Sequence, residues 1–369
     1  MPEETIYERM LSHGVSRRDF MKLCGMIVGA MGLQLAPPLE ASGLPAELGA
    51  APDLTATVAH ALETKTRVPV IWLEFQDCAG CSEALTRSQS PTLIDLVLNH
   101  ISIDYHETLT AAAGVQAEEN KQEVMKKYAG QYVLVVEGGV PVNSDGVYCT
   151  IGGRTAVDLL KEAAAGAAAI ISTGTCASFG GLPRANPNPT GAKGTWEIIT
   201  DKPVVNISGC PAIPEVFTGT LLHFIVFGTL PELDSLHRPK TFYGQTVHDR
   251  CLRRPFYEAG KFANSFDDEG ARQGWCLYKL GCKGPTTYNS CATIKWGQGL
   301  SFPIQSGHPC LGCSEPNFWD RGGFYLGQSA PINRPGVTVA AGAVAVGAVV
   351  GAGVGLANRH QKQQAVEKE

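Results

Sequence analysis

Short runs of β-branched and other apolar residues alternate with helical stretches between about residues 68 and 230. Such runs are typical of strands buried on both faces of a sheet. They predict strands at Val68–Phe75, Ile101–Tyr105, Tyr132–Glu137, Ala169–Thr173 and Val204–Ile207. Helices are predicted between them at Pro91–Asn99, Gln116–Tyr128 and Arg154–Ala168. Because strands that alternate with helices form parallel sheets, we expect an α/β domain over residues 68–235 with a flavodoxin-like, doubly wound parallel sheet.

The periodic pattern fades after about Pro231, and the following segment is rich in glycine, proline and aromatic residues. A segment with so little apolar periodicity needs metal sites or disulfides to hold it together. We therefore expect a second, small and irregular domain over residues 236–326.

The N-terminal pattern is typical of an export signal. Two adjacent arginines lie within Ser16–Lys22, and an apolar stretch follows over about residues 23–36. This combination matches the twin-arginine signal of bacteria, with an ordinary amphipathic helix as the alternative. We expect a signal peptide over residues 1–50, cleaved within residues 41–50, and then a linker over 51–67. Since twin-arginine export carries folded proteins, the signal also predicts a cofactor that is inserted in the cytoplasm.

An uncharged apolar run near the other end of the chain predicts a membrane anchor. The run spans Val337–Ala357, and its 21 residues are long enough for a transmembrane helix. Gly347, Gly351 and Gly355 are spaced so that a second helix can approach closely. The alternative is a buried helix, but the polar tail over 358–369 favours the anchor. With the export signal, this predicts a globular part on the periplasmic side of the membrane and a cytoplasmic tail.

Composition and charge exclude several classes of protein. The formal net charge is −5 and 44% of the residues are hydrophobic, which argues against a nucleic-acid-binding protein and against wholesale disorder. The chain contains neither a G-x-G-x-x-G nor a Walker A sequence, so no nucleotide is expected. The twelve cysteines are too clustered to be incidental, and they become the candidates for the chemistry.

Four of these cysteines follow predicted strands. Cys78 and Cys81 follow the first strand, Cys176 the fourth and Cys210 the fifth. Because the carboxyl ends of parallel strands meet at one edge of a sheet, three loops would bring these four thiols together. The spacing leaves an iron–sulfur cluster, a redox-active cysteine pair and structural zinc open as interpretations. Cys210 is followed by proline, as the last cysteine of many cluster motifs is.

Two further ligand groups lie in the irregular segment. The first combines one imidazole with three thiols, in His248, Cys251, Cys276 and Cys282. That set suits zinc or a [4Fe–4S] cluster, and a solvated surface histidine is the alternative for His248. The second group offers only three thiols, in Cys291, Cys310 and Cys313. The missing fourth ligand disfavours structural zinc and suits a [3Fe–4S] cluster.

Six segments carry these residues: Cys78–Glu83, Gly174–Ser178, Gly209–Pro211, His248–Cys251, Gly274–Cys291 and Phe302–Glu315. Together they resemble the small, electron-transfer subunit of [NiFe] hydrogenases, over about residues 66–326. The resemblance is specific, because eleven ligand residues match in order and spacing. The leader and the C-terminal apolar run also resemble those of the membrane-bound respiratory uptake enzymes.

The resemblance implies three clusters with defined ligands. A proximal [4Fe–4S] cluster, facing the large subunit, would be held by Cys78, Cys81, Cys176 and Cys210. A medial [3Fe–4S] cluster would be held by Cys291, Cys310 and Cys313. A distal [4Fe–4S] cluster, near the surface where electrons leave, would be held by His248, Cys251, Cys276 and Cys282. This chain would contain no catalytic residue, because the nickel–iron centre that splits H₂ belongs to the large subunit. Electrons would pass on to a membrane cytochrome b or another quinone-linked subunit.

Several positions depart from the family pattern. Gly80 and Gly181 stand where the oxygen-tolerant subgroup carries two extra cysteines, so we expect an ordinary proximal cluster and no special oxygen tolerance from that mechanism. Pro303 stands where some relatives carry a further cysteine, which agrees with a three-thiol medial site. Cys149 fits no ligand position and is expected to be a small buried hydrophobic residue. Cys24 lies in the expected leader and would be lost on maturation.

Other polar residues allow two interpretations each. Glu74, Asp77 and Glu83 flank the first cysteine motif, where they would relay protons near the subunit interface or act as ordinary loop carboxylates. The loop over 182–194 would touch the partner or lie free on the surface. Two other functions compete with the hydrogenase hypothesis: an iron–sulfur subunit of another respiratory complex, and a zinc-stapled binding protein. The second and third cysteine groups and the export signal argue against the first of these.

Overall fold

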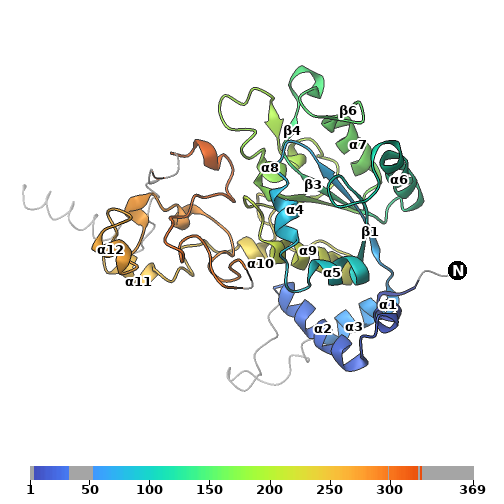
Figure 1. Cartoon of the computed structure of the whole chain (residues 1–369), viewed down its shortest axis with the longest axis horizontal. Coiled ribbons are helices and arrows are strands. Elements are labelled where there is room, and N and C mark those ends of the chain that lie inside the picture. The colour runs from blue at the N-terminus through green and yellow to red at the C-terminus, as the bar shows by residue number, and fades with distance from the viewer. Residues whose placement is uncertain (1–3, 33–52, 298, 323–324, 326–369) are drawn as a thin grey trace, which may run out of the picture. The chain divides into compact units, whose positions relative to one another are not determined.

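The computed structural model describes residues 4–32, 53–297, 299–322 and 325. Its centre is a parallel sheet of five strands in the order β2-β1-β3-β7-β9 (Figure 1). These strands are β1 (Val68–Glu74), β2 (Ile101–His106), β3 (Val133–Glu137), β7 (Ala169–Thr173) and β9 (Val204–Ile207). This order is that of flavodoxin-like sheets, so the predicted α/β fold is confirmed, and each of the five predicted strands matches to within one residue at either end.

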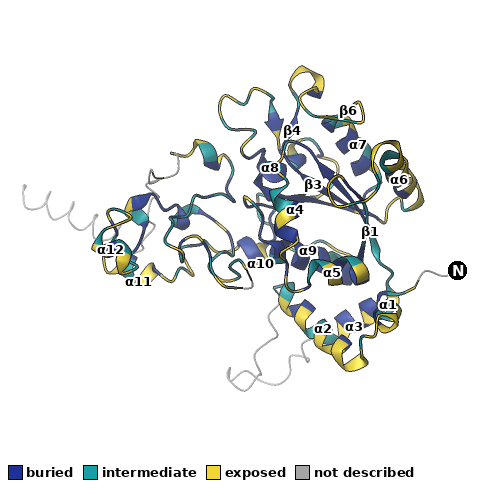
Figure 2. Ribbon diagram, in the orientation of Figure 1, coloured by how far each residue is buried: buried dark blue, intermediate teal, exposed yellow. Residues whose placement is uncertain are grey.

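Helices cover both faces of the sheet, as a doubly wound fold requires. Val70 and Trp72 of β1 belong to one hydrophobic core, together with α3 (Leu54–Thr64) and α9 (Pro214–Phe227). The alternate residues Ile71 and Leu73 belong to a second core, with α6 (Gly114–Lys127) and α7 (Ala156–Gly166). Since successive side chains of a strand point to opposite faces, a continuous apolar strand supplies both cores. Figure 2 shows the resulting buried centre.

Three predicted helices are present with shifted ends. Those expected at Gln116–Tyr128 and Arg154–Ala168 appear as α6 and α7. The one expected at Pro91–Asn99 starts as α5 (Leu93–Asp95) and continues as a single π-helical turn, η2 (Leu96–His100).

Helix α9 is a long element that the hydrophobic pattern did not predict. It is buried on nearly all sides, so it lacks the polar stripe that makes a helical period visible. The sequence does mark both ends of this helix. Pro214 occupies its first turn, and Gly228 ends it in the left-handed conformation. Proline at the start and glycine just beyond the end are common helix boundaries.

Short elements shape the edge of the sheet where the first cysteine group lies. Helix α4 (Gly80–Leu85) follows β1, and α8 (Gly174–Phe179) follows β7. Two small antiparallel pairs lie nearby: β4 (Val140–Pro141) with β8 (Ala192–Lys193), and β5 (Thr150–Ile151) with β6 (Arg154–Thr155). A single turn of 3₁₀ helix lies at η4 (Thr195–Glu197), and an irregular turn at η3 (Asn143–Gly146) contains Ser144 and Asp145 in the left-handed conformation.

Beyond α9 the chain forms the irregular region that the sequence predicts. The described helices there are α10 (Lys240–Tyr243), α11 (Arg254–Glu258), α12 (Glu269–Arg272), η5 (Tyr278–Leu280), η6 (Gly284–Thr286) and η7 (Phe318–Asp320), none longer than five residues. A small core contains Val247, Leu277, Phe302 and Ile304 as well as the cysteine Cys282. A core of this size is marginal by itself, which is consistent with a segment that depends on metal ligands.

The N-terminal segment forms two helices, α1 (Ile6–Ser12) and α2 (Arg17–Ala30), that pack against α3 and α9. The expected cleavage region lies outside the described residues, and so does the predicted anchor over 337–357. Within the described part of the chain, no helix combines the length and the apolar character that crossing a bilayer requires.

Candidate metal centres

The first ligand group lies at the carboxyl ends of three strands, as the sequence predicts. Cys78 follows β1, Cys81 lies in α4, Cys176 in α8, and Cys210 follows β9. Burial raises the pKa of the Cys176 and Cys210 thiols to about 11, and neighbouring thiols of the same group add to the shift. The pKa of Cys81 is raised well above its usual value by burial, then by Glu137, with smaller contributions from Cys176 and Cys210. Thiols that influence each other in this way lie close together.

Glycine makes room for sulfur in this group. A Cβ atom on Gly174, whose φ is +82°, would lie 2.4 Å from Cys81 Sγ. A Cβ on Gly181 would lie 2.6 Å from Cys176 Sγ, and its φ is +52°. Gly181 is one of the two positions where the oxygen-tolerant subgroup carries a cysteine. The backbone of this chain therefore has no space for such a side chain without rearrangement.

The second group, at Cys291, Cys310 and Cys313, is also buried. Burial raises the pKa of Cys310 to about 12 and that of Cys313 to about 11, and it raises that of Cys291 well above the usual value. Neighbouring thiols of the group raise the pKa of Cys291 and that of Cys310 further. The Trp296 side chain hydrogen-bonds the Cys291 sulfur, and the Thr287 hydroxyl hydrogen-bonds that of Cys310.

The third group lies in the loops around α11 and η5. Burial raises the pKa of Cys276 to about 11 and that of Cys282 to about 12. Thiols of the same group add to the shift at Cys276, and Cys310 of the second group adds to that at Cys282. Burial raises the pKa of Cys251 as well. Backbone contacts hold His248 beside them, because the Cys251 N–H donates to the His248 carbonyl at 3.2 Å. The His248 ring packs edge-on against Tyr257 with 4.7 Å between ring centroids. Desolvation is the main cause that lowers its pKa, which favours the neutral imidazole that binds metals.

Hydrogen bonds link the three groups in series. The Cys210 backbone N–H donates to Cys313 Sγ, which joins the first group to the second. The Cys310 N–H donates to Cys282 Sγ at 3.4 Å and joins the second group to the third. A cavity of about 630 Å³ lies at the first junction and is lined by Cys210, Cys291 and Cys313.

Thr175 forms hydrogen bonds to both sides of the junction between the first and second groups. Its hydroxyl donates to the Cys313 carbonyl and accepts the Gly209 N–H at 2.9 Å. Its own N–H donates to the Gly209 carbonyl at 2.8 Å. The side chain is 1% exposed, so water does not compete for these bonds. The residue was not among the sequence candidates, although it directly precedes the candidate ligand Cys176.

The donor set fits iron–sulfur clusters. Ten of the eleven candidate ligands are thiols, and backbone N–H groups point at several of the sulfurs. Ala212 donates to Cys81, Leu182 to Cys176, and Arg253 to Cys251 at 3.4 Å. Such N–H groups stabilise negative charge on sulfur, and hydrogen bonds of this kind set the potentials of iron–sulfur clusters. Burial disfavours an unpaired thiolate, which is the direction in which the pKa values of these thiols are shifted.

A buried acidic network adjoins the first group. Ser82 Oγ lies 2.6 Å from Glu137 Oε2, 3.1 Å from His106 Nε2 and 3.2 Å from Glu74 Oε1. Glu137 also accepts the Cys81 N–H at 2.9 Å. Burial is the main cause that raises the pKa of Glu74 to about 7, and the carboxylate of Glu137 adds to it. The sequence had singled out Glu74 but not the other three residues, which come from different elements.

The other two flanking carboxylates lie on the surface. Glu83 is exposed and pairs with Arg87 at 2.5 Å, so it fits the interpretation of an ordinary loop carboxylate. Asp77 is exposed too, although one of its oxygens lies within 4.8 Å of ligand atoms of Glu74 and Glu137.

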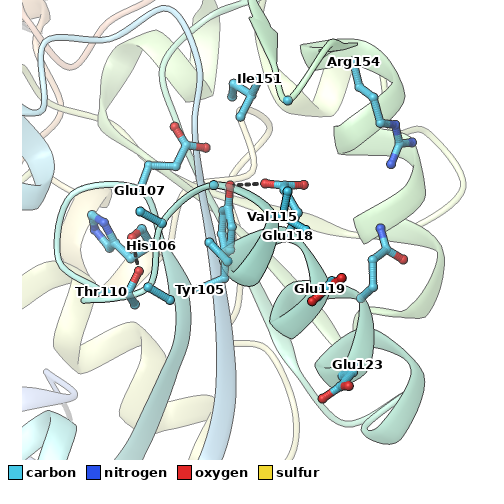
Figure 3. Close-up of a pocket in the computed structure, with 16 residues that line it drawn as sticks. Tyr105, His106, Glu107, Thr110, Val115, Glu118, Glu119, Glu123, Ile151 and Arg154 are labelled. Carbon is cyan, nitrogen blue, oxygen red and sulfur yellow. Dashed lines mark hydrogen bonds between the residues drawn. The ribbon is translucent and has the colours of Figure 1, made fainter.

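A cavity in the described part of the chain lies apart from the thiols. Its volume is about 1020 Å³, and it opens between the end of β2 and helix α6 (Figure 3). Tyr105, Glu107, Glu118 and Glu119 are among its lining residues, and Tyr105 donates to Glu118 at 2.8 Å. None of the eleven candidate ligands lines it.

Two cysteines lie outside the ligand groups. Cys149 was expected to be a small buried hydrophobic residue, but its side chain is only half-buried. It packs at the margin of the second core. Its position just before the β5–β6 hairpin, near the surface, accounts for the exposure. Cys24 is fully buried within α2.

The fold and these sites define an iron–sulfur electron-transfer protein. Residues 243–326 match the family model for the C-terminal part of the NiFe/NiFeSe hydrogenase small subunit, and residues 78–224 match the model "NADH ubiquinone oxidoreductase, 20 Kd subunit". The chain is 50% identical to the uptake hydrogenase small subunit of Afipia carboxidovorans, over 95% of this chain and 94% of that protein. It is 45% identical to the hydrogenase-1 small chain of Escherichia coli K12, over 98% of this chain and 95% of that one. The chain therefore belongs to the family of [NiFe] hydrogenase small subunits.

Solved structures agree with this assignment. A chain of the [NiFeSe] hydrogenase from Desulfomicrobium baculatum superimposes with a TM-score of 0.67 at 33% identity, covering 71% of this chain and all of that one. A chain of the actinobacterial-type NiFe-hydrogenase of Ralstonia eutropha H16 gives a TM-score of 0.65 at 26% identity, covering 77% and 91%.

Family membership decides between the competing functions. The protein is the electron-transfer small subunit of a [NiFe] hydrogenase, an oxidoreductase in which the small subunit holds iron–sulfur clusters and pairs with a large subunit. The match to a protein of respiratory NADH oxidation involves only the sheet region, whereas the hydrogenase relatives cover nearly the whole chain. Another respiratory complex and a zinc-stapled binding protein are thereby set aside.

Proposed function

We propose that three clusters occupy the three ligand groups. Cys78, Cys81, Cys176 and Cys210 hold a proximal [4Fe–4S] cluster next to the large subunit. Cys291, Cys310 and Cys313 hold a medial [3Fe–4S] cluster. His248, Cys251, Cys276 and Cys282 hold a distal [4Fe–4S] cluster. Each cluster, when bound, takes up and passes on one electron. This chain orders the clusters, shields them from water and donates hydrogen bonds to their ligand sulfurs.

The observation that carries this proposal is the serial linkage of the three groups. Cys210 belongs to the first group and hydrogen-bonds Cys313 of the second, while Cys310 of the second hydrogen-bonds Cys282 of the third. Electrons that pass from the large subunit to the surface through three clusters need the first group next to the second and the second next to the third. A set of unrelated structural metal sites would have no need of ligand-to-ligand contacts between groups.

We further propose that the enzyme works on the periplasmic side of the cytoplasmic membrane. The twin-arginine segment supports export of the folded chain, and the apolar run over 337–357 supports a single-pass anchor. An anchored small subunit would hand electrons to a membrane cytochrome b or another quinone-linked subunit. The direction is then H₂ oxidation, which agrees with relatives named uptake hydrogenase.

Purification from membranes tests the proposal. The chain is expected to co-purify with a nickel-containing large subunit and to show H₂-dependent dye reduction. Metal analysis should find iron and acid-labile sulfide in the amounts that two [4Fe–4S] clusters and one [3Fe–4S] cluster require. Zinc without sulfide would contradict the ligand assignment. Recovery of all the active enzyme from the soluble fraction would contradict the anchor and leave the cluster assignment standing.

A further inference from the structure

The N-terminal helices are part of the hydrophobic core. In α2, Phe20, Cys24, Ile27 and Val28 are each at most 1% exposed and lie on one helical face. They belong to the same core as α9 and one face of the sheet. On the other side of α2, Met21 and Met26 are 39% and 53% exposed. The segment that resembles a leader thus packs as an amphipathic helix on the folded body (Figure 2).

Close backbone contact fixes α2 on α9. A Cβ atom at Gly219 of α9 would lie 2.1 Å from the carbonyl oxygen of Ala30, the last residue of α2. Only glycine allows two helices to approach so closely at this point. Two hydrogen bonds hold α1 on the folded body. The Ile6 N–H donates to the Lys65 carbonyl at 2.8 Å, and the Arg9 side chain donates to the Leu98 carbonyl.

The turn that follows α2 touches the cysteine-rich region as well. A Cβ atom at Gly32 would lie 2.3 Å from Thr241 Cγ2 and 3.3 Å from the Phe242 ring, both in α10. Ser290 lies next to the medial ligand Cys291, and its hydroxyl donates to the Phe242 carbonyl. The surface under α2 is therefore built jointly by α9 of the sheet region and by α10, which is hydrogen-bonded to the medial ligand segment through Ser290 and to Ser208 through Tyr243.

The paired arginines remain accessible while the apolar face is hidden. Arg17 has a side chain that is 75% exposed and its neighbour Arg18 is exposed too. The nearest carboxylate oxygen to Arg17, on Glu63, is 4.0 Å away, so this contact is weak. A receptor for the arginines can reach them in the docked state, but a bilayer cannot reach Phe20, Ile27 or Val28.

We propose that α9 and α10 form a docking surface for the chain's own leader, so that the leader stays packed on the uncleaved protein once the medial ligand segment has folded. Docking withholds the apolar face of α2 from the membrane, and undocking releases it. Because α10 is held by Ser290, the surface is complete only when the region around Cys291 is in place. This inference rests on the leader assignment under Proposed function.

Hydrogen exchange of the full-length chain in complex with its large subunit tests the docking. Amides of residues 20–30 are expected to exchange slowly in the wild type. Gly219→Leu should raise their exchange rate by about tenfold or more, while β3 stays protected. Ile27→Ser should have the same effect, whereas Met26→Ser, on the exposed face, should have little. Wild-type amides that exchange as fast as those of Gly219→Leu would overturn the proposal.

A second variant tests the dependence on the medial segment. Cys291→Ser is expected to speed exchange in residues 20–30 without loss of protection in β3, which serves as the control for folding of the sheet. If residues 20–30 stay as protected as in the wild type, the joint surface is refuted.

The leader assignment itself is tested separately. Replacing both arginines by lysine, Arg17→Lys with Arg18→Lys, leaves the docked face intact and should block export while exchange in residues 20–30 stays slow. Normal export of this variant would contradict the twin-arginine assignment but not the docking.

Discussion

At the scale of single residues, the junction between the first two ligand groups depends on one hydroxyl. Thr175 connects Gly209, next to Cys210 of the first ligand group, with the carbonyl of Cys313 of the second. A buried N–H that loses its partner costs about 1–3 kcal/mol. The side chain therefore holds the Cys210 N–H in position to donate to Cys313 Sγ, and we expect it to be a positioning residue for electron transfer.

Thr175→Val should weaken this junction. We expect H₂-dependent dye reduction to fall severalfold and the separation of the two clusters, measured by pulsed EPR of their paramagnetic states, to increase or become heterogeneous. Thr175→Ser should retain the wild-type values because it keeps the hydroxyl. Thr220→Val removes an equally buried hydroxyl that donates to Val216 within α9 and serves as the control. A uniform, unchanged cluster separation in Thr175→Val would show that the hydroxyl does not position the ligands.

At the scale of elements, η2 buries an imidazole without a partner. His100 is fully buried, and neither of its ring nitrogens has a hydrogen-bond partner among the residues that the structure describes. Desolvation lowers its pKa from 6.5 to about 4. Between these two values the unfolded chain binds more protons than the folded chain, so folding stability falls as the pH drops through this window. Across this whole pH window, His100 lowers the free energy of unfolding by about 3 kcal/mol.

His100→Leu should remove this part of the acid sensitivity. We expect the difference in thermal unfolding temperature between the variant and the wild type to grow in favour of the variant as the pH is lowered from about 7 to 4. Calorimetry at several pH values gives both curves, and the carboxyl groups that titrate in the same range cancel in the comparison. Parallel curves for the two proteins would mean that His100 does not titrate differently on unfolding.

At the scale of the whole molecule, hydrogen bonds join the three ligand groups in series, and in the proposed function electrons pass along this series away from the large subunit. His248→Ala removes the imidazole that we propose as a distal ligand, and it should slow electron exit to an acceptor severalfold or more. Hydrogen/deuterium exchange by the large subunit should persist, since that chemistry precedes electron transfer through this chain. His223→Ala, in α9, is the matched control. Equal loss of both activities would argue against the proposed order of clusters.

The sequence by itself predicted how the candidate ligands are grouped and where the five central strands lie, and the structure contains those strands. It did so because short apolar runs mark strands buried on both faces, and because the carboxyl ends of parallel strands must meet. The sequence also predicted that the second region is irregular, because its apolar residues follow neither a helical nor a strand period.

Only the tertiary structure decided how those parts meet. The role of Thr175, the network around Ser82 and the contact between Cys310 and Cys282 join residues that are far apart in the chain, and no local pattern encodes them. Helix α9 escaped prediction because burial on nearly all sides removes the polar stripe. The packing of α2 on Gly219 was also hidden, because an amphipathic pattern shows that a helix has a partner but not which surface provides it.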